Sequence, residues 1–473
     1  MSVPVGEQNP GGFGPELYRA RRNALREAMG GGLHFFLGHQ LQPRNYRDNT
    51  YPFRQDSHFL YYTGLQAPHL ALLCYPETDY DVLFAWPAAT MDDVVWSGPG
   101  ATPVDLAREA GIDTVDDIAR LGVYLTAARA QKLDVHYLPP YQGSSLFRLA
   151  ELLVVDPTDV TPGASARLAE SVSRRRSIKD AAEIAEIEDA LGVTDRMHRR
   201  ALALAAPGMK ECQVAGAIQG IALEANREQA YNPIVTVHGE VLHNHGYGNR
   251  LEAGQLMLID AGAESPRGYA SDITRTLPVA GRFSPEQTEV YETVLRAQLA
   301  AISRIRPGVT YREIHLDSSR AIVEGLVAMG LMKGDAAGAV EAGAHALFFP
   351  HGVGHMLGLD VHDMEDLGDI VGYAKGEKRS GQFGLNFLRL ARTLEAGFVL
   401  TVEPGIYFIP ALIDRWRQEG LHKDFIRYEK VERFRTFGGI RIEDDVVVTA
   451  EGARVLGPGI PKTVAEVEAA MAK

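Results

Sequence analysis

The sequence contains very little cysteine. Only Cys74 and Cys212 occur among its 473 residues, far apart in the chain. Two such residues make no disulfide framework, so we expect two buried thiols in a reducing cytoplasm. No apolar run approaches the roughly 20 residues that span a bilayer. The N-terminus also lacks the basic start and apolar core of a signal peptide. We therefore expect a cytoplasmic protein without a membrane partner.

Basic side chains are also in the minority. There are 48 Lys and Arg residues against 61 Asp and Glu residues, which gives a formal net charge of −13. No basic run or aromatic RNA-binding motif offsets this balance, so we expect no nucleic-acid partner. The 45% hydrophobic and 23% charged fractions are ordinary for a globular protein. A chain of 473 residues exceeds one ordinary core, which predicts two domains.

The first part of the sequence alternates strand-like and helix-like segments. Strands are expected at 33–37 and 70–75, and a helix is expected near 115–121. Proline and glycine between 156 and 163 mark the region of a linker, which a connecting helix follows. This alternation predicts an α/β N-terminal domain over residues 1–173.

The second part, residues 174–473, repeats one order of elements. A helix that ends at a Pro-Gly pair, a second helix and then strands occur twice, with the Pro-Gly pairs at 207–208 and 307–308. Ser284 and Thr310 have the spacing of helix-capping residues in the second copy. We expect two α/β halves around a central sheet.

The stretch QLMLIDAGAESPRGYASDITRT is typical of a strand, a glycine-containing turn and a return strand. It carries Asp260 and Asp272, and two carboxylates on paired strands repel each other unless a cation lies between them. Taken singly, each aspartate is more often a strand-end or turn residue than a metal ligand. Three more candidate ligands lie downstream: His355, Glu403 and Glu443. Four carboxylates and one imidazole suit two divalent cations such as Mn²⁺ better than one tetrahedral Zn²⁺, which predicts a two-metal hydrolase.

Histidine and arginine supply further candidates. HGVGH contains His351 and His355, and its glycines permit tight backbone geometry around the two imidazoles. We expect His355 to bind metal, while His351, His362 and His243 donate hydrogen bonds to a substrate. Arg441 shares a strand face with Glu443 and is either an anion-binding residue or part of a structural ion pair.

Several of these motifs together resemble the M24 metallopeptidases of the "pita-bread" fold. The resemblance is carried by IDAG with ASDITRT, FPHGVGHMLGLDVHD, LTVEPGIYFI and GGIRIEDDVVVT. Within that family the chain is most similar to Xaa-Pro dipeptidase (prolidase), and after that to aminopeptidase P. The segment YPFRQDSHFLYYTGL also resembles the N-terminal segments of both enzymes. The resemblance implies an α/β fold: a creatinase-like N-terminal domain and a pita-bread catalytic domain with pseudo-two-fold halves. It also implies a homodimer formed through the N-terminal domains.

The resemblance implies a role for each candidate residue. The ligands of two metal ions, most simply Mn²⁺ with Co²⁺ or Zn²⁺ as alternatives, would be Asp260, Asp272, His355, Glu403 and Glu443. Asp272 and Glu443 would bridge the two ions. The catalytic residues would be His243, His351, His362 and Glu403. The substrate-binding residues would be Arg389, Arg441, Tyr231 and Asp48, the last matching an aspartate that in aminopeptidase P reaches a neighbouring subunit's site.

The implied reaction is hydrolysis of the Xaa-Pro bond of dipeptides by a hydroxide that bridges the two metals. Arg389 would hold the dipeptide's C-terminal carboxylate. One alternative is an aminopeptidase P, which releases the N-terminal residue from longer Xaa-Pro-Yaa peptides. Another is a metal-free relative that binds peptides or acts as an amidinohydrolase, and the complete ligand set argues against it.

Asp272 gives the first testable prediction. Because Asp272→Asn removes a bridging ligand, the variant should keep its fold but hold fewer than two metal ions per chain, with activity lost. Elemental analysis and circular dichroism of the purified variant measure both properties. Full activity in this variant, or in chelator-treated protein shown to be free of metal, would contradict the two-metal hypothesis.

Overall fold

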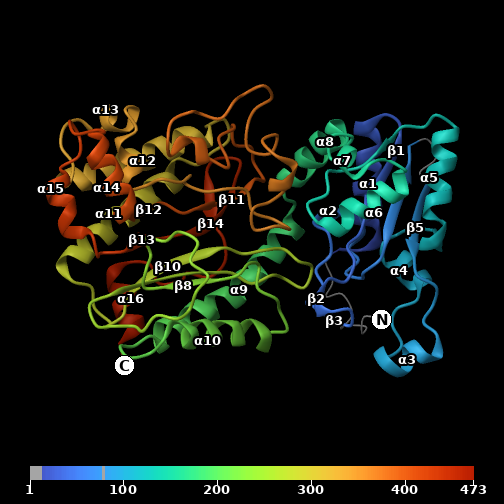
Figure 1. Ribbon diagram of the computed structural model, residues 1–473, viewed down its shortest axis with the longest axis horizontal. Coiled ribbons are helices and arrows are strands. Elements are labelled where there is room, and N and C mark those ends of the chain that lie inside the picture. The colour runs from blue at the N-terminus through green and yellow to red at the C-terminus, as the bar shows by residue number, and fades with distance from the viewer. Residues whose placement is uncertain (1–12, 77–79, 473) are drawn as a thin grey trace. The chain divides into compact units, whose positions relative to one another are not determined.

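The structure is a computed structural model that describes residues 13–76 and 80–472. The chain divides into two compact units, Met1–Arg176 and Ser177–Lys473 (Figure 1). Each unit combines helices with strands, so the mixed α/β class expected from the sequence is confirmed.

The N-terminal unit is built on a five-stranded sheet with the order β6-β5-β4-β1-β7. Its strands are β1 (Leu33–Leu37), β4 (Ala71–Tyr75), β5 (Tyr80–Ala85), β6 (Thr114–Asp117) and β7 (Val135–His136). Strand β4 runs antiparallel to both β1 and β5. The outer strand β7 is parallel to β1, and the outer strand β6 is parallel to β5. A small hairpin is formed by β2 (Pro43–Tyr46) and β3 (Asn49–Thr50).

The N-terminal unit also contains helices, several of which pack on the sheet and complete its core. They are α1 (Pro15–Met29), α2 (Ser57–Thr63), α3 (Met91–Ser97), α4 (Pro103–Glu109), α5 (Leu121–Ala130), α6 (Gly143–Leu153), α7 (Pro157–Val160) and α8 (Ala166–Ser177). Buried side chains of α5 and α6, such as Leu125 and Leu152, pack with Phe35, Leu73 and Phe84 from the strands. The apolar faces that the alternating pattern predicts therefore meet in one core.

Two expectations from the sequence are wrong. The segment 115–121 is not a helix, because Thr114–Asp117 pairs in parallel with β5 and the Asp117 side chain then caps a 3₁₀ turn. Cys74 is buried as expected, but Cys212 is exposed. Its neighbour Glu211 takes the buried position instead and accepts a hydrogen bond from the Val237 backbone.

The C-terminal unit contains two helix pairs, each followed in sequence by strands. The helices are α9 (Ala181–Leu204), α10 (Glu211–Glu224), α11 (Pro285–Arg304), α12 (Tyr311–Ala328), α13 (Ala336–Glu341), α14 (Pro410–Glu419), α15 (Tyr428–Val431) and α16 (Val464–Met471). Helix α10 packs on α9 and α12 packs on α11. Ser284 and Thr310 cap α11 and α12 through complete capping boxes, as the sequence predicts.

The strands of this unit form three small sheets, ordered β10-β9-β8, β11-β14-β15 and β12-β13. Their bounds are β8 (Ile234–Thr236), β9 (Leu256–Ala261), β10 (Ile273–Pro278), β11 (Val399–Val402), β12 (Gly405–Tyr407), β13 (Gly439–Arg441), β14 (Asp444–Val448) and β15 (Ala453–Val455). The β11–β12 segment runs antiparallel to the β13–β14 segment, with Val402 opposite Asp444 and Gly405 opposite Arg441.

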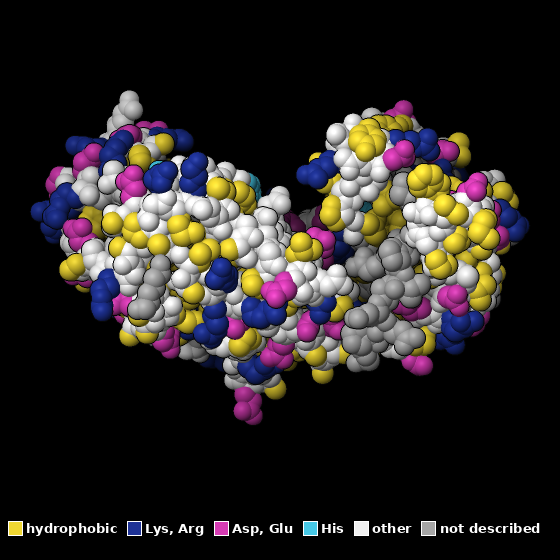
Figure 2. Space-filling model, turned by 90° about the horizontal axis from the view of Figure 1, so that it is seen from below, with side chains coloured by type: hydrophobic (Ala, Val, Ile, Leu, Met, Phe, Trp, Pro, Cys, Tyr) yellow, Lys and Arg dark blue, Asp and Glu magenta, His cyan; other side chains and the backbone are white. Residues whose placement is uncertain are grey.

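The surface carries both signs of charge. On the face drawn in Figure 2, Lys and Arg side chains alternate with Asp and Glu side chains. Among the helices of residues 13–76 and 80–472, none has both the length and the apolar character of a membrane span.

The β9–β10 hairpin depends on a glycine at its turn. A Cβ atom on Gly262 would lie 1.7 Å from the Ser271 carbonyl oxygen and 3.3 Å from the Asp272 nitrogen. No side chain fits at that distance, so the close approach of the two strands requires glycine. Asp260 and Asp272 flank this contact.

Gly262→Ala should therefore push the two strands apart. We expect a loss of about 1–3 kcal/mol of folding free energy, the usual cost of overpacking, together with weaker metal binding. Chemical denaturation and metal titration measure the two effects. The matched control is Gly248→Ala, since Gly248 has open space around its Cβ position and should change stability by less than about 0.5 kcal/mol. Equal stability of the two variants would contradict this account.

Candidate metal centre

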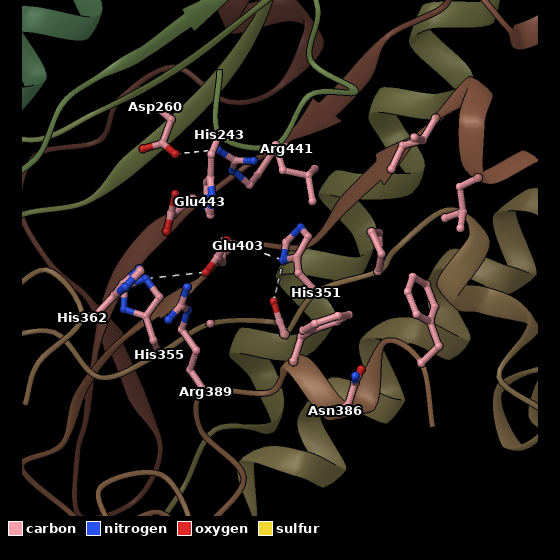
Figure 3. A pocket seen from close by; sticks show the side chains of 18 of the residues that line it. His243, Asp260, His351, His355, His362, Asn386, Arg389, Glu403, Arg441 and Glu443 are labelled. Carbon is pink, nitrogen blue, oxygen red and sulfur yellow. Dashed lines mark hydrogen bonds and ion pairs between the residues drawn. The ribbon is translucent and has the colours of Figure 1, made fainter. Parts of the chain in front are cut away.

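A cavity of about 780 Å³ opens in the C-terminal unit. Its walls carry residues from all the motifs that the sequence analysis singled out in this part of the chain. They include Asp260, Asp272, His355, Glu403 and Glu443, together with His243, His351, His362, Arg389 and Arg441. Figure 3 shows Asp260, Glu443 and Glu403 on one side of this space, with His355 and His362 below them.

The four carboxylates occupy points where strands end or break. Asp260 lies near the end of β9, and Asp272 immediately precedes β10. Glu403 lies between β11 and β12, and Glu443 lies between β13 and β14. The four side chains therefore line one space from both halves of the unit.

His355 is held against β11 by its backbone. Its carbonyl accepts a hydrogen bond from the Thr401 N–H, and its own N–H donates to the Thr401 hydroxyl. This contact depends on Gly354, where a Cβ atom would lie 2.0 Å from the Thr401 carbonyl oxygen. The glycine of the HGVGH motif therefore brings His355 up to the carboxylates.

The donor atoms converge closely. One atom from each of Asp272, His355 and Glu443 lies within 4.8 Å of the others. The Nε2 atom of His355 is 3.4 Å from Asp272 and 3.6 Å from Glu403. The Tyr231 hydroxyl lies 2.6 Å from an Asp260 oxygen and 2.5 Å from an Asp272 oxygen. It therefore links Asp260, the remaining carboxylate, to the cluster of Asp272, His355, Glu403 and Glu443.

Burial of these like charges makes the ionised state unfavourable without a cation. The pKa of Asp272 is raised to about 8, chiefly by loss of solvation and secondly by repulsion from Asp260. Burial likewise raises the pKa of Glu403 to about 7 and that of Glu443 well above its usual range. Oxygen donors with one imidazole are the set that divalent cations such as Mn²⁺ prefer, so these residues fit a metal centre.

Arg441 is the cation that the fold itself supplies. It is buried, and its guanidinium lies 2.5 Å from Asp260, 3.0 Å from the Thr274 hydroxyl and 3.1 Å from the Tyr407 hydroxyl. Of the two possibilities open for Arg441, the structure therefore shows the ion pair, on a wall of the cavity. One guanidinium does not balance four carboxylates.

The histidines around the cavity are held neutral. Burial and the nearby charge of Arg441 lower the pKa of His351 to about 3. Its Nε2 atom lies 2.9 Å from the Tyr407 hydroxyl. Burial also lowers the pKa values of His243 and His362. The Nδ1 atom of His362 lies 2.7 Å from Glu365, and its ring centre lies 4.3 Å from that of His355.

Arg389 lies within reach of this whole group. It precedes β11 and forms an ion pair with Glu365. Its positive charge contributes to the lowered pKa of each of four histidines: His243, His351, His355 and His362. The Arg389 side chain lines the same cavity as these histidines.

Asp48 and Tyr231 are predicted to bind substrate, and their positions in the structure leave that role a prediction. Asp48 is exposed on the β2–β3 turn of the N-terminal unit, and it is not among the residues that line the cavity. Tyr231 contacts the carboxylates of Asp260 and Asp272 with its hydroxyl.

Sequence reasoning missed Tyr407 and Glu365. Tyr407 bridges His351 and Arg441, and Glu365 joins His362 to Arg389. The spacing of Glu365, three residues after His362, was the available signal, since residues at that spacing meet on one turn.

Comparisons with known proteins agree with this geometry. The profile of metallopeptidase family M24 matches residues 185–450, and that of the aminopeptidase P N-terminal domain matches residues 18–136. The "Probable Xaa-Pro aminopeptidase PEPP" of Paracoccidioides brasiliensis is 31% identical, with 96% of each chain covered. Human Xaa-Pro dipeptidase is 32% identical over 96% of this chain and 91% of its own. The structure of Pseudomonas aeruginosa aminopeptidase PepP has a TM-score of 0.80 and 32% identity, covering 97% of this chain and 98% of that one.

The fold and the cluster of carboxylates with histidine thus define a metal-dependent peptidase. The chain belongs to metallopeptidase family M24, with an N-terminal unit of the aminopeptidase P type. The expected resemblance and the two-part fold are confirmed.

The raised pKa values predict how the metal-free protein responds to pH. The ordinary values are 3.8 for Asp272 and 4.5 for Glu403, and the folded values are about 8 and about 7. A carboxyl with a raised folded pKa contributes stability below its unfolded pKa, and this stability is lost as the pH rises through the folded pKa. Chelator-treated protein should therefore have a lower Tm at pH 8.5 than at pH 5.5.

Metal should reverse this trend, because cations bind the ionised carboxylates. The rise in Tm on adding Mn²⁺ should be larger at pH 8.5 than at pH 5.5, as measured by differential scanning fluorimetry. Asp272→Asn, which lacks one of the titrating groups, should show a flatter profile without metal. A profile for the metal-free wild type that rises with pH would contradict the assignment.

Proposed function

We propose that this chain is a two-metal hydrolase that cleaves the Xaa-Pro bond of dipeptides. The observation that carries the dipeptidase assignment is the place of Arg389, which lines the cavity and pairs with Glu365, the carboxylate that also contacts His362. A guanidinium this near the reacting bond is well suited to the carboxylate that follows the proline ring of a dipeptide. The similarity of the chain to human Xaa-Pro dipeptidase supports the same assignment.

The metal ligands in this proposal are the five residues named from the sequence: Asp260, Asp272, His355, Glu403 and Glu443. Asp272 and Glu443 would be shared by two cations, for which the oxygen-rich donor set favours Mn²⁺. Divalent cations bound here would lower the pKa of water and polarise the scissile carbonyl.

The surrounding side chains would supply the remaining steps. His243 is neutral, so it would donate its one N–H to the oxyanion that develops on the scissile carbonyl. The one N–H of neutral His362 is donated to Glu365, so His362 would hold that carboxylate beside the site. Glu403 would carry a proton to the departing prolyl nitrogen through its carboxylate. The buried ion pair of Arg441 with Asp260 would keep that ligand oriented.

Proline at the second position also fits the cavity. The proline nitrogen carries no N–H, so recognition must come from the shape of the ring. The cavity offers apolar walls for this purpose, with Phe383, Phe387, Ile409 and Leu412 among its lining residues. The names of the relatives refer to the same Xaa-Pro bond.

Aminopeptidase P activity is a second candidate with specific support. The cavity of about 780 Å³ extends past the ligands to residues of α14, so it has room for more chain after proline. Several relatives, including the P. brasiliensis and P. aeruginosa proteins, are named aminopeptidases. A homodimer that brings Asp48 to a neighbouring subunit's site would belong with this candidate.

Cleavage of a dipeptide and of a tripeptide distinguishes the two candidate functions. The wild-type enzyme loaded with Mn²⁺ should have a much higher kcat/KM for Ala-Pro than for Ala-Pro-Ala, because only the dipeptide presents its proline carboxylate to Arg389. Arg389→Ala should lower kcat/KM for Ala-Pro by about 10- to 150-fold, the range for a hydrogen bond to a charged group. Cleavage of Ala-Pro-Ala should change little.

The matched control is Arg415→Ala, since Arg415 also lines the cavity but belongs to α14 and pairs with Glu419. This variant should keep the preference for the dipeptide. A wild-type enzyme that cleaves Ala-Pro-Ala faster than Ala-Pro is an aminopeptidase P, and the role given to Arg389 would then be wrong.

A further inference from the structure

Glu365 stands between the catalytic histidines and the arginine that would bind the substrate carboxylate. It begins the 3₁₀ turn Glu365–Leu367 and lines the cavity. One carboxylate oxygen pairs with Nη1 of Arg389, and the other lies 2.7 Å from Nδ1 of His362. The Glu365 backbone N–H also donates to the His362 carbonyl, which fixes the short turn between them.

This arrangement keeps a negative charge beside Arg389. The hydrogen bond with His362, together with the charge of Arg389, lowers the pKa of Glu365 to about 2. Glu365 is thus ionised throughout the range in which a peptidase of this kind is assayed. In Figure 3 the Arg389 side chain extends from its loop toward Glu403 and the pair of His355 and His362.

Two carboxylates would therefore compete for the Arg389 guanidinium: that of Glu365 and that of the substrate. Within the described part of the chain, Glu365 is the carboxylate that forms an ion pair with Arg389. A dipeptide ending in proline brings a second carboxylate, and after cleavage the free proline still carries it. Each must share Arg389 with Glu365 or displace it, and a like charge nearby weakens its binding.

We propose that Glu365 is an intramolecular competitor for the carboxylate site at Arg389, which weakens the binding of free proline and so favours its release after cleavage. The inference rests on the proposed dipeptidase function. His362 keeps Glu365 at the site, because the hydrogen bond between them holds the turn that carries both residues. Glu365 is a specificity-determining residue in this account, while Arg389 provides the affinity.

The exposure of the pair limits the size of the effect. The side chains of Arg389 and Glu365 are 35% and 48% exposed, so solvent screens their attraction. A fully desolvated partner would change binding by about 10- to 150-fold. We therefore expect removal of the Glu365 charge to change binding by only about 3- to 10-fold.

The experiment compares Glu365→Gln with wild type, both loaded with Mn²⁺. Glutamine keeps the size of the side chain and a hydrogen-bonding group for His362, but removes the charge that competes for Arg389. The inhibition constant of free proline and the KM for Ala-Pro should both fall by about 3- to 10-fold. Calorimetric titration with proline gives the same comparison without turnover, and metal content should stay unchanged.

Two controls isolate the competition. Ala-Pro-NH₂ lacks the carboxylate, so its KM should be the same in wild type and Glu365→Gln. Glu419→Gln removes the partner of a different cavity arginine, Arg415, and should leave the inhibition constant of proline unchanged. In the Arg389→Ala background, Glu365→Gln should have no effect on proline binding, since the contested cation is gone.

A proline inhibition constant that rises or stays the same in Glu365→Gln overturns the inference, since Glu365 would then position Arg389 or do nothing there. An equal effect on Ala-Pro-NH₂ overturns it as well. Failure of the proposed function is a separate result, because it shows in the wild type alone as faster cleavage of Ala-Pro-Ala than of Ala-Pro.

Discussion

The mutual repulsion of buried carboxylates is the constraint on which the rest of this structure depends. Asp260, Asp272, Glu403 and Glu443 converge on one cavity wall, and burial raises the pKa values of the last three. The protein offsets this charge only partly, through the ion pair of Arg441 with Asp260. Divalent cations would offset the remaining charge, so stability, affinity for metal and, in our proposal, catalysis depend on the same group of side chains.

The scaffold resists this repulsion with hydrogen bonds between its two halves. The Thr274 hydroxyl donates to Glu443, and the Arg275 guanidinium donates to the Glu443 carbonyl and pairs with Asp444. These bonds join β10 of the first half to the β13–β14 segment of the second. All the groups are buried, and breaking one partner of such a network costs more than an exposed bond is worth. Glu443 is therefore held in position by the scaffold itself.

In our proposal, a second set of cavity residues concerns recognition rather than charge balance. The segment between His355 and Glu403 supplies His362, Glu365 and Arg389, and a buried pair of Lys179 with Asp363 anchors its start. Arg389 is partly exposed and already paired with Glu365, so in our proposal it would bind a substrate carboxylate and also release it. The length and sequence of this segment thus set the choice between dipeptides and longer peptides in our proposal.

Motifs and local periodicity in the sequence determined the family, the α/β class, the capped starts of α11 and α12 and the strand–turn–strand around Asp260 and Asp272. These features depend on neighbouring residues, whose spacing the chain displays directly. Only the tertiary structure decided that Arg441 pairs with Asp260, 181 residues away, and that Glu365 reaches Arg389, 24 residues away. It also decided that residues 114–117 join β5 as a strand and that Cys212 faces solvent. The physical reason is the same in each case. Which partner a charge, a strand edge or a helix face meets is set by the packing of distant segments, and local propensity carries no record of that choice.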